Sequence, residues 1–233
     1  MSLASGGRGR TILFDLDGTL TDSKPGIINS ALYALRRFNE TTGANLPTPD
    51  PQSLGFMLGP PLRDSFARLV GPGDADRLVA LYRERYEPVG MLENSVFPGV
   101  PEALDGLAAQ NYRIIVATSK PEAYARRILD HFHLARFFEA IHGAEPDGTR
   151  SDKGELIAYV LKSHGLDPWA TAMIGDRAHD AIGAKKAGVW AIGVLWGYGS
   201  REELSAAGAD PLLAAPSDIA WALQGDSNDA RLE

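Results

Sequence analysis

The sequence predicts an α/β fold in which a parallel sheet is covered by helices and interrupted by a smaller helical domain. Short, continuous apolar runs at residues 12–14, 114–116 and 172–174 are typical of strands that are buried on both faces of a parallel sheet. Helical patterns alternate with such runs from residue 98 onward, which indicates strand–helix–strand units. Residues 23–94 show helical spacing without an evident strand, so we interpret them as an insert.

The helical insert follows the first strand. A capped helix start is expected near Ser23 because Pro25 suits a first helical turn. Two further helices are expected over residues 62–70 and 75–87. The resulting division is a helical domain at residues 23–95, an α/β domain at residues 9–22 and 96–224, and disordered ends at residues 1–8 and 225–233.

The remaining elements alternate between helix and strand. Their order predicts a parallel sheet with right-handed crossovers and helices on both faces. Strands are expected over residues 112–117, 140–142, 172–175 and 189–194, and a short strand and helix between residues 212 and 223. Helices are expected over residues 99–110, 153–164 and 178–187, with another that has Pro121 in its first turn.

Composition limits the classes of function. The chain has 233 residues, and 44% of them are hydrophobic, which suffices for a substantial core. Its formal net charge of −7 argues against a nucleic-acid polymer or an anionic membrane as a partner. The absence of cysteine excludes disulfides, thiolate metal sites and a cysteine nucleophile. We expect a cytoplasmic protein because no apolar run approaches the roughly 18 residues of a membrane span. Its oligomeric state stays open.

Polar side chains follow the carboxyl ends of separate predicted strands. Asp15 and Asp17 follow the first strand, Thr118 follows the second and Asp176 follows the third. These ends converge at one edge of a parallel sheet, and Lys153 opens a helix that could reach the same edge. Carboxylates, a hydroxyl and a lysine in one place favour a hard metal ion and a phosphate. The alternative for the first pair is an Asp-rich turn with no chemical role.

The order of these residues resembles that of a known family. The sequence is similar to the haloacid dehalogenase-like hydrolases, within them to the phosphoglycolate phosphatase-like branch with a helical cap. The resemblance extends over residues 11–223 and implies a three-layer, Rossmann-like core. Segments 147–153 and 197–201 also resemble members known as 5′-nucleotidases. The four motifs are Asp15-Leu16-Asp17-Gly18-Thr19, a strand ending at Thr118, Lys153, and Gly175-Asp176-Arg177-Ala178-His179-Asp180.

The resemblance also implies a role for each motif residue. Asp15 would attack phosphorus to form an aspartyl-phosphate, and Asp17 would protonate the leaving group and then activate water. Mg²⁺ would be bound by Asp15, Asp176 and the backbone carbonyl of Asp17. Asp180 would support the metal through water or through another ligand. The phosphate of the substrate would be bound by Gly18, Thr19, Thr118, Ser119 and Lys153.

Several other residues have competing interpretations. Arg63 in the helical insert could contact the substrate, although an exposed surface arginine is the more common case. Lys120 and Ser119 could touch the substrate or simply end the loop, and we favour the loop. His179 is expected on an exposed helix face. A second Asp-Gly-Thr sequence at residues 147–149 is expected to be a turn.

Within this family, the sequence favours one type of reaction. Dehalogenases of this family lack a carboxylate two residues after the nucleophile, so Asp17 favours phosphoryl transfer. The leading hypothesis is a Mg²⁺-dependent phosphomonoesterase for a small phosphate such as phosphoglycolate, a nucleoside monophosphate or a sugar phosphate. The alternatives are a sugar-phosphate mutase and a non-catalytic binding protein that responds to phosphate or metal.

Overall fold

The computed structural model describes residues 10–145 and 147–229, and it divides the chain into two compact units. One unit is formed by the chain up to Leu20 and from Val96 onward, and the other by Thr21–Ser95. The expected end at residues 1–8 lies outside the described residues. Because the chain leaves the first unit after Leu20 and returns to it at Val96, the second unit is an insertion in sequence.

The first unit contains a six-stranded sheet in the order β5-β4-β1-β6-β7-β8. Every pairing along this sheet is parallel, as the alternating sequence pattern predicted. Leu13 of the central strand lies opposite Ile115 and Met173, and all three side chains are buried. The strands are β1 (Thr11–Phe14), β4 (Arg113–Pro121), β5 (Ala140–Ala144), β6 (Thr171–Gly175), β7 (Trp190–Val194) and β8 (Leu212–Leu213).

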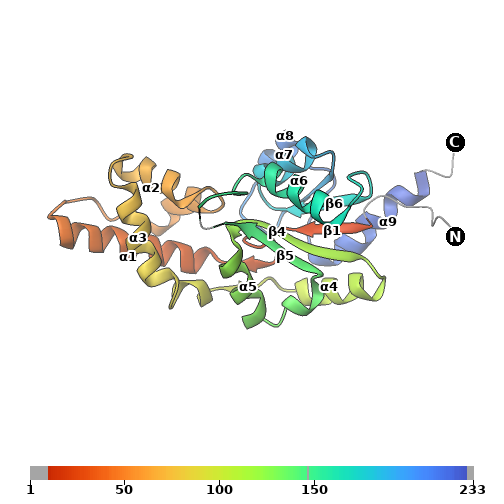
Figure 1. Ribbon diagram of the computed structural model, residues 1–233, viewed down its shortest axis with the longest axis horizontal. Coiled ribbons are helices and arrows are strands. Elements are labelled where there is room, and N and C mark those ends of the chain that lie inside the picture. Colours follow the sequence, from red (N-terminus) through yellow and green to blue (C-terminus); the bar gives the residue numbers. More distant parts are fainter. Residues whose placement is uncertain (1–9, 146, 230–233) are drawn as a thin grey trace. The chain divides into compact units, whose positions relative to one another are not determined.

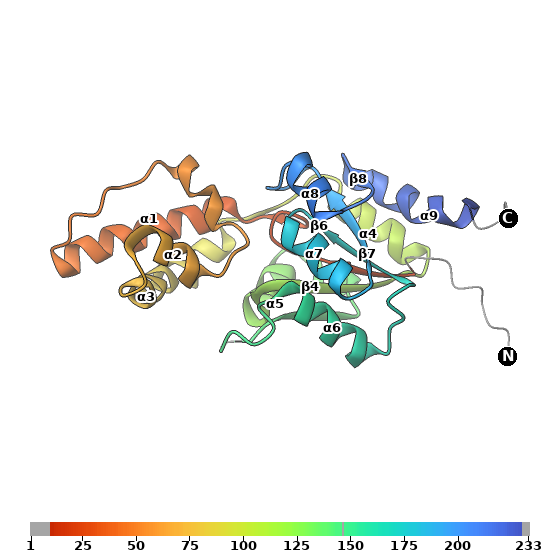
Figure 2. The same ribbon diagram turned by 90° about the horizontal axis from the view of Figure 1, so that it is seen from above.

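Helices cover both faces of this sheet (Figures 1 and 2). α6, α7 and α8 lie on one face, and α4 and α5 lie on the other. The helices are α4 (Val100–Ala109), α5 (Glu122–His131), α6 (Lys153–His164), α7 (Ala178–Lys186), α8 (Arg201–Ala207) and α9 (Ile219–Asp229), with 3₁₀ turns at Ala135–Phe137 and Pro216–Asp218. The predicted three-layer α/β architecture is therefore confirmed.

Local signals explain where these elements begin and end. Asp152 caps α6 by accepting a hydrogen bond from the Glu155 N–H, and the helix ends at Gly165 with a positive φ of 58°. α8 was not predicted; it is a short helix that is capped by Ser200 and buries Leu204. The predicted fold ends near residue 224, whereas α9 continues to Asp229.

β4 is longer than predicted. It continues past the expected end at residue 117 to Pro121, which precedes α5 instead of lying in its first turn. The pairing with β5 shifts register between Ala117 and Pro121. This irregularity carries Thr118, Ser119 and Lys120 at the carboxyl end of the strand.

The second unit is helical. Its interior contains a row of buried aromatic rings in which Tyr82 lies 6.1 Å from Phe66 and 5.0 Å from Tyr86, measured between ring centroids. Arg85 donates to both carboxylate oxygens of Glu93 at 2.7 and 2.8 Å. The elements are α1 (Lys24–Thr42), α2 (Leu62–Val70), α3 (Ala75–Tyr86), 3₁₀ turns at Pro51–Met57 and Gly90–Leu92, and the short strands β2 (Thr21–Asp22) and β3 (Ser95–Val96).

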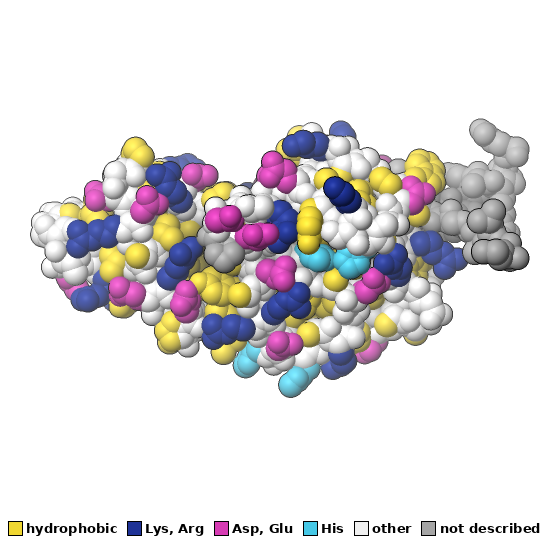
Figure 3. Space-filling view, in the orientation of Figure 1, with side chains coloured by type: hydrophobic (Ala, Val, Ile, Leu, Met, Phe, Trp, Pro, Cys, Tyr) yellow, Lys and Arg dark blue, Asp and Glu magenta, His cyan; other side chains and the backbone are white. Residues whose placement is uncertain are grey.

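Two further features concern the charges on the surface and the apolar character of the helices. On the face shown in Figure 3, lysine and arginine side chains are interspersed with acidic ones. Among the described residues, no helix combines the length and the apolar character that crossing a membrane requires.

Candidate active site

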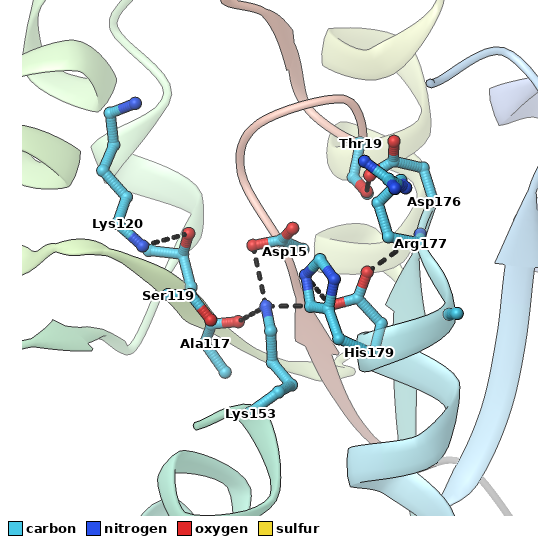
Figure 4. A network of polar contacts seen from close by, with 12 residues as sticks. Asp15, Thr19, Ala117, Ser119, Lys120, Lys153, Asp176, Arg177 and His179 are labelled. Atoms are coloured by element: carbon cyan, nitrogen blue, oxygen red, sulfur yellow. Dashed lines mark hydrogen bonds and ion pairs between the residues drawn. The ribbon is translucent and has the colours of Figure 1, made fainter. Parts of the chain in front are cut away.

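Lys153 is the centre of a buried cluster of charges at the carboxyl edge of the sheet. It is the first residue of α6, and its Nζ lies 2.9 Å from Asp15 Oδ1 and 2.8 Å from Asp180 Oδ1. The same ammonium group donates to the carbonyl oxygen of Ala117 at 3.0 Å (Figure 4). Because Asp15 follows β1, Ala117 belongs to β4 and Asp180 belongs to α7, one lysine connects three elements. The predicted convergence of these residues is thus observed.

Burial and attraction act against each other in this cluster. Burial alone would lower the pKa of Lys153, but attraction by Asp15 and Asp180 outweighs it and raises that pKa above its usual value. Burial raises the pKa of Asp15, although the ammonium group of Lys153 opposes the shift. Burial likewise disfavours ionised Asp180, yet Lys153 and His179 together hold the pKa of Asp180 below its usual value. The lysine therefore remains charged in the interior.

Asp176 occupies the end of β6 and is fully buried. Its Oδ1 accepts a hydrogen bond from Thr19 Oγ1 at 3.1 Å, and its Oδ2 accepts one from the Tyr198 N–H at 2.8 Å. Burial raises the pKa of Asp176 well above the usual value, and repulsion from Asp180 and Asp15 adds to the shift. A carboxyl group in these surroundings gains from a nearby cation.

Glycines allow the backbone to approach Asp176 closely. Gly18 has a φ of 85°, and a Cβ at this position would overlap the carboxylate of Asp176. A Cβ at Gly197 would overlap the same side chain and the carbonyl oxygen of Gly18. Trp196 Nε1 donates to the Thr19 carbonyl at 2.9 Å and so connects this loop to the turn after β1. The Gly-Thr pair of the first motif therefore has a structural reason.

The donor set fits a hard divalent cation. Asp15, Asp176 and Asp180 are buried carboxylates, and Lys153 contacts two of them, Asp15 and Asp180. One ligand atom each from Asp15, His179 and Asp180 lies within 4.8 Å of the others. Oxygen donors of this kind suit Mg²⁺, and a bound cation would offset the repulsion that raises the pKa of Asp176.

Asp17 is paired with a different lysine. Lys120 Nζ donates to Asp17 Oδ1 at 2.9 Å and to Oδ2 at 2.7 Å. Thr118 is buried, and its hydroxyl accepts a hydrogen bond from the Lys120 N–H at 3.2 Å. Ser119 Oγ donates to the Ser151 carbonyl at 3.0 Å and connects the loop after β4 to the segment before Lys153.

Two residues at this edge differ from their predicted roles. Lys120 was expected only to end the loop, but its side chain is 6% exposed and forms the ion pair with Asp17. His179 was expected on an exposed helix face, whereas the ring is partly buried with Nε2 3.6 Å from Asp180 Oδ1. The only signal for either residue was its position beside a motif. Arg63 lies in the helical unit, where its Nε donates to Asp76 at 2.9 Å, and its contact with a substrate stays a prediction.

A further pair of residues supports the loop between β6 and α7. Glu203 of α8 accepts hydrogen bonds from Arg177 Nε at 2.8 Å and from the Ala178 N–H at 2.9 Å. Asp180 Oδ2 accepts a hydrogen bond from the Arg177 N–H at 3.1 Å. The missed helix α8 thus helps to fix the start of α7, which carries Asp180 next to Lys153.

Comparisons with known proteins agree with this arrangement. A 5′-nucleotidase of Pseudomonas aeruginosa is 46% identical over 84% of this chain and 86% of its own length. A phosphoglycolate phosphatase of Caulobacter vibrioides is 32% identical over 91% of this chain and 89% of its own length. Among solved structures, a predicted phosphatase from Clostridium acetobutylicum superimposes with a TM-score of 0.84 at 36% identity, covering 97% of this chain and 100% of that one.

One relative is named as a kinase and not as a phosphatase or nucleotidase. The tyrosine-protein kinase PtkA of Mycobacterium tuberculosis is 40% identical over 82% of this chain, but this match spans only 64% of the kinase. A family model described as haloacid dehalogenase-like hydrolase matches residues 12–194, which include all four motifs. The fold, the cluster around Lys153 and these similarities lead to one assignment: the chain belongs to the haloacid dehalogenase-like hydrolases.

Proposed function

We propose that the protein is a Mg²⁺-dependent phosphatase that hydrolyses small phosphate monoesters through an aspartyl-phosphate intermediate. The observation that carries this proposal is the ion pair between Asp15 and Lys153, formed at the carboxyl end of the central strand. A carboxylate held beside an ammonium group can approach an anionic phosphate, because the ammonium group offsets part of the repulsion. The relatives named as phosphatases and as a 5′-nucleotidase support the same reaction.

The proposed reaction has two steps. In the first, an oxygen of Asp15 forms a bond to phosphorus while the ester P–O bond breaks, and Asp17 gives a proton to the leaving oxygen. In the second, water attacks the aspartyl-phosphate, Asp17 accepts the proton of that water, and inorganic phosphate leaves. Lys153, Thr118, Ser119 and the turn at Gly18 and Thr19 are the proposed phosphate-binding groups.

The proposed metal site uses the donors at the ends of β1 and β6. Asp15, Asp176 and the backbone carbonyl of Asp17 would hold Mg²⁺, with Asp180 supporting the site from α7. When bound, Mg²⁺ supplies positive charge beside the anionic substrate. We also propose that the helical unit acts as the cap that selects the substrate, with Arg63 as a candidate contact.

Nucleoside 5′-monophosphates are the first substrate class to test, because the relative named 5′-nucleotidase is the more similar of the two phosphatase-type relatives reported above. Phosphoglycolate is the second class. The decisive measurement is Mg²⁺-dependent phosphate release from a panel that contains both classes and several sugar phosphates.

Two aspartate variants test the nucleophile with a matched control. Asp15→Asn removes the attacking oxygen, and we expect it to abolish phosphate release without loss of the folded state. Asp147→Asn alters the second Asp-Gly-Thr sequence, which lies in an exposed turn, and should leave activity unchanged. Unchanged turnover by Asp15→Asn would refute the proposal. Release of phosphate from no member of the panel, with tight binding of one of them, would favour the non-catalytic alternative.

The similarity to PtkA gives a second candidate, transfer of a phosphoryl group to a tyrosine hydroxyl. The candidate is weaker because the match leaves part of the kinase uncovered. Incubation with ATP and a tyrosine-containing peptide distinguishes the two outcomes: phosphotyrosine would support transfer, and free phosphate alone would support hydrolysis. Conversion of glucose 1-phosphate into its isomer faster than phosphate release would instead indicate a mutase.

A further inference from the structure

The ion pair between Lys120 and Asp17 is built into the fold. Lys120 Nζ contacts both oxygens of one carboxylate at 2.7 and 2.9 Å, so the orientation of the Asp17 side chain is fixed. The two side chains are only 6% and 17% exposed. Exposed lysine–carboxylate pairs contribute little because water and side-chain disorder compete with them, but this pair is largely shielded from both.

The backbone of Lys120 is also held by contacts with neighbouring residues. Its N–H donates to the hydroxyl of Thr118 at 3.2 Å. On the other side β5 packs so closely that a Cβ at Gly143 would overlap the Lys120 carbonyl oxygen. The side chain extends away from Lys153 (Figure 4), so the two lysines serve different carboxylates. Lys120 therefore reaches Asp17 from a rigid position at the end of β4.

We propose that Lys120 is a positioning residue for the acid–base chemistry of Asp17 and that it makes the enzyme selective for alkyl phosphate esters. This inference rests on the proposed function, in which Asp17 donates a proton to the leaving oxygen. When that proton leaves, negative charge develops on the Asp17 carboxylate, and the ammonium group of Lys120 already lies where it stabilises this charge. By contacting both oxygens, Lys120 also fixes the direction in which the Asp17 carboxyl group presents its proton to the leaving oxygen.

The proton balance shows which substrates depend on Lys120. Breaking the P–O bond of an alkyl ester sends an electron pair to a strongly basic alkoxide, which must take the proton of Asp17 to leave as an alcohol. The proton returns to Asp17 from the attacking water in the second step. An aryl ester such as p-nitrophenyl phosphate releases a weakly basic phenolate, which leaves without a proton. The contribution of Lys120 should therefore be large for alkyl esters and small for aryl esters.

The test compares kcat/KM for AMP and for p-nitrophenyl phosphate in wild type and in Lys120→Met. This parameter covers the steps up to formation of the aspartyl-phosphate, so slow hydrolysis of that intermediate does not obscure it. General acid catalysis contributes about 10²- to 10⁴-fold, and we expect Lys120→Met to lose about 10- to 100-fold on AMP and less than about threefold on the aryl ester. Lys120→Arg should recover part of the loss. Lys162→Met, which removes an exposed lysine of α6, is the control and should lose nothing.

A double-mutant cycle shows whether Lys120 acts through Asp17. If it does, Lys120→Met should cost little on AMP in a background that already contains Asp17→Asn. The double variant leaves no unpaired carboxylate at residue 17, so its comparison with Asp17→Asn alone stands even if Lys120→Met folds poorly. Equal losses on the two esters, or full additivity with Asp17→Asn, would overturn the inference while the phosphatase proposal stands. Absence of wild-type activity on both esters would overturn the proposed function and this inference together.

Discussion

Two lysines neutralise carboxylates at the end of β1, and their surroundings differ. Lys153 is 3% exposed and is shared by two buried carboxylates, Asp15 and Asp180. Lys120 contacts both oxygens of the Asp17 carboxylate, whose side chain retains 17% exposure. The first lysine connects several elements, whereas the second fixes the Asp17 side chain.

Because the two lysines differ in burial, removing them should affect the stability of the fold and the catalytic rate to different degrees. Removing one partner of a fully buried charge pair leaves an uncompensated charge in the interior, which is strongly destabilising. At the second pair some water can reach the carboxylate, so removing the lysine should cost less stability. We therefore expect the Lys153 pair to be required for both folding and activity, and the Lys120 pair mainly for catalysis.

The largest expected effect is that of Lys153→Met. Phosphate release should fall by at least about 10³-fold, because the ammonium group beside Asp15 is lost. The free energy of unfolding should fall by about 3–5 kcal/mol, since Asp15 and Asp180 lose their buried cation. Urea denaturation in EDTA measures the stability, and Lys120→Met provides the comparison. A similar loss of stability in both variants would show that the two pairs are equivalent.

The second-largest expected effect is the increase in Tm on addition of Mg²⁺. The cation should offset the negative charge of the carboxylates that Lys153 does not contact. At a concentration of 100 times Kd, a ligand that binds only the folded state stabilises it by about 2.7 kcal/mol. We expect Mg²⁺ to raise the Tm of wild type and of Asp147→Asn, and to raise that of Asp176→Asn much less. The same Tm increase in Asp176→Asn would exclude Asp176 as a ligand.

A smaller effect is expected at Glu203, which supports the loop that carries Asp176. Glu203→Gln should weaken the hydrogen bonds to Arg177 and Ala178 and reduce Mg²⁺ affinity by about tenfold, a loss typical of residues that orient metal ligands. Glu202→Gln changes the exposed neighbour and is the matched control. Titration of activity with Mg²⁺ measures the affinity. Equal affinities in the two variants would show that the loop holds its position without α8.

The same contrast explains what could be predicted from the sequence. The sheet was predictable because β1, β4 and β6 are continuous apolar runs, and Asp15, Asp176 and Lys153 were predictable because motif order places them at one edge. The Lys120–Asp17 pair could not be predicted, because it depends on a register shift at the end of β4 and on close packing against Gly143. Likewise, α8 buries too few side chains to produce a clear helical pattern.

A third pair of titratable side chains, His142 and His164, differs from the two lysine–carboxylate pairs because its members cannot both be charged. His142 Nε2 lies 2.8 Å from His164 Nε2, whose other nitrogen lies 3.3 Å from Glu139. A hydrogen bond between two imidazoles requires one neutral ring, in contrast with the lysine pairs. Burial lowers the pKa of His142, and repulsion from His164 adds to the shift.

The sign of the pH effect follows from this lowered pKa. Near the unfolded value of 6.5 the unfolded chain binds a proton at His142 before the folded protein does, so unfolding becomes more favourable as the pH falls. The contribution of His142 to the free energy of unfolding is therefore complete above pH 6.5. It is lost as the pH falls through the lower pKa that His142 has in the folded protein. We expect the decrease in Tm between pH 7.5 and 5.5 to be smaller in His142→Gln than in wild type, by about 1–2 °C. His131→Gln, at an exposed position of α5, is the control and should match wild type. An unchanged pH dependence in His142→Gln would mean that the imidazole pair accommodates a second proton at no cost.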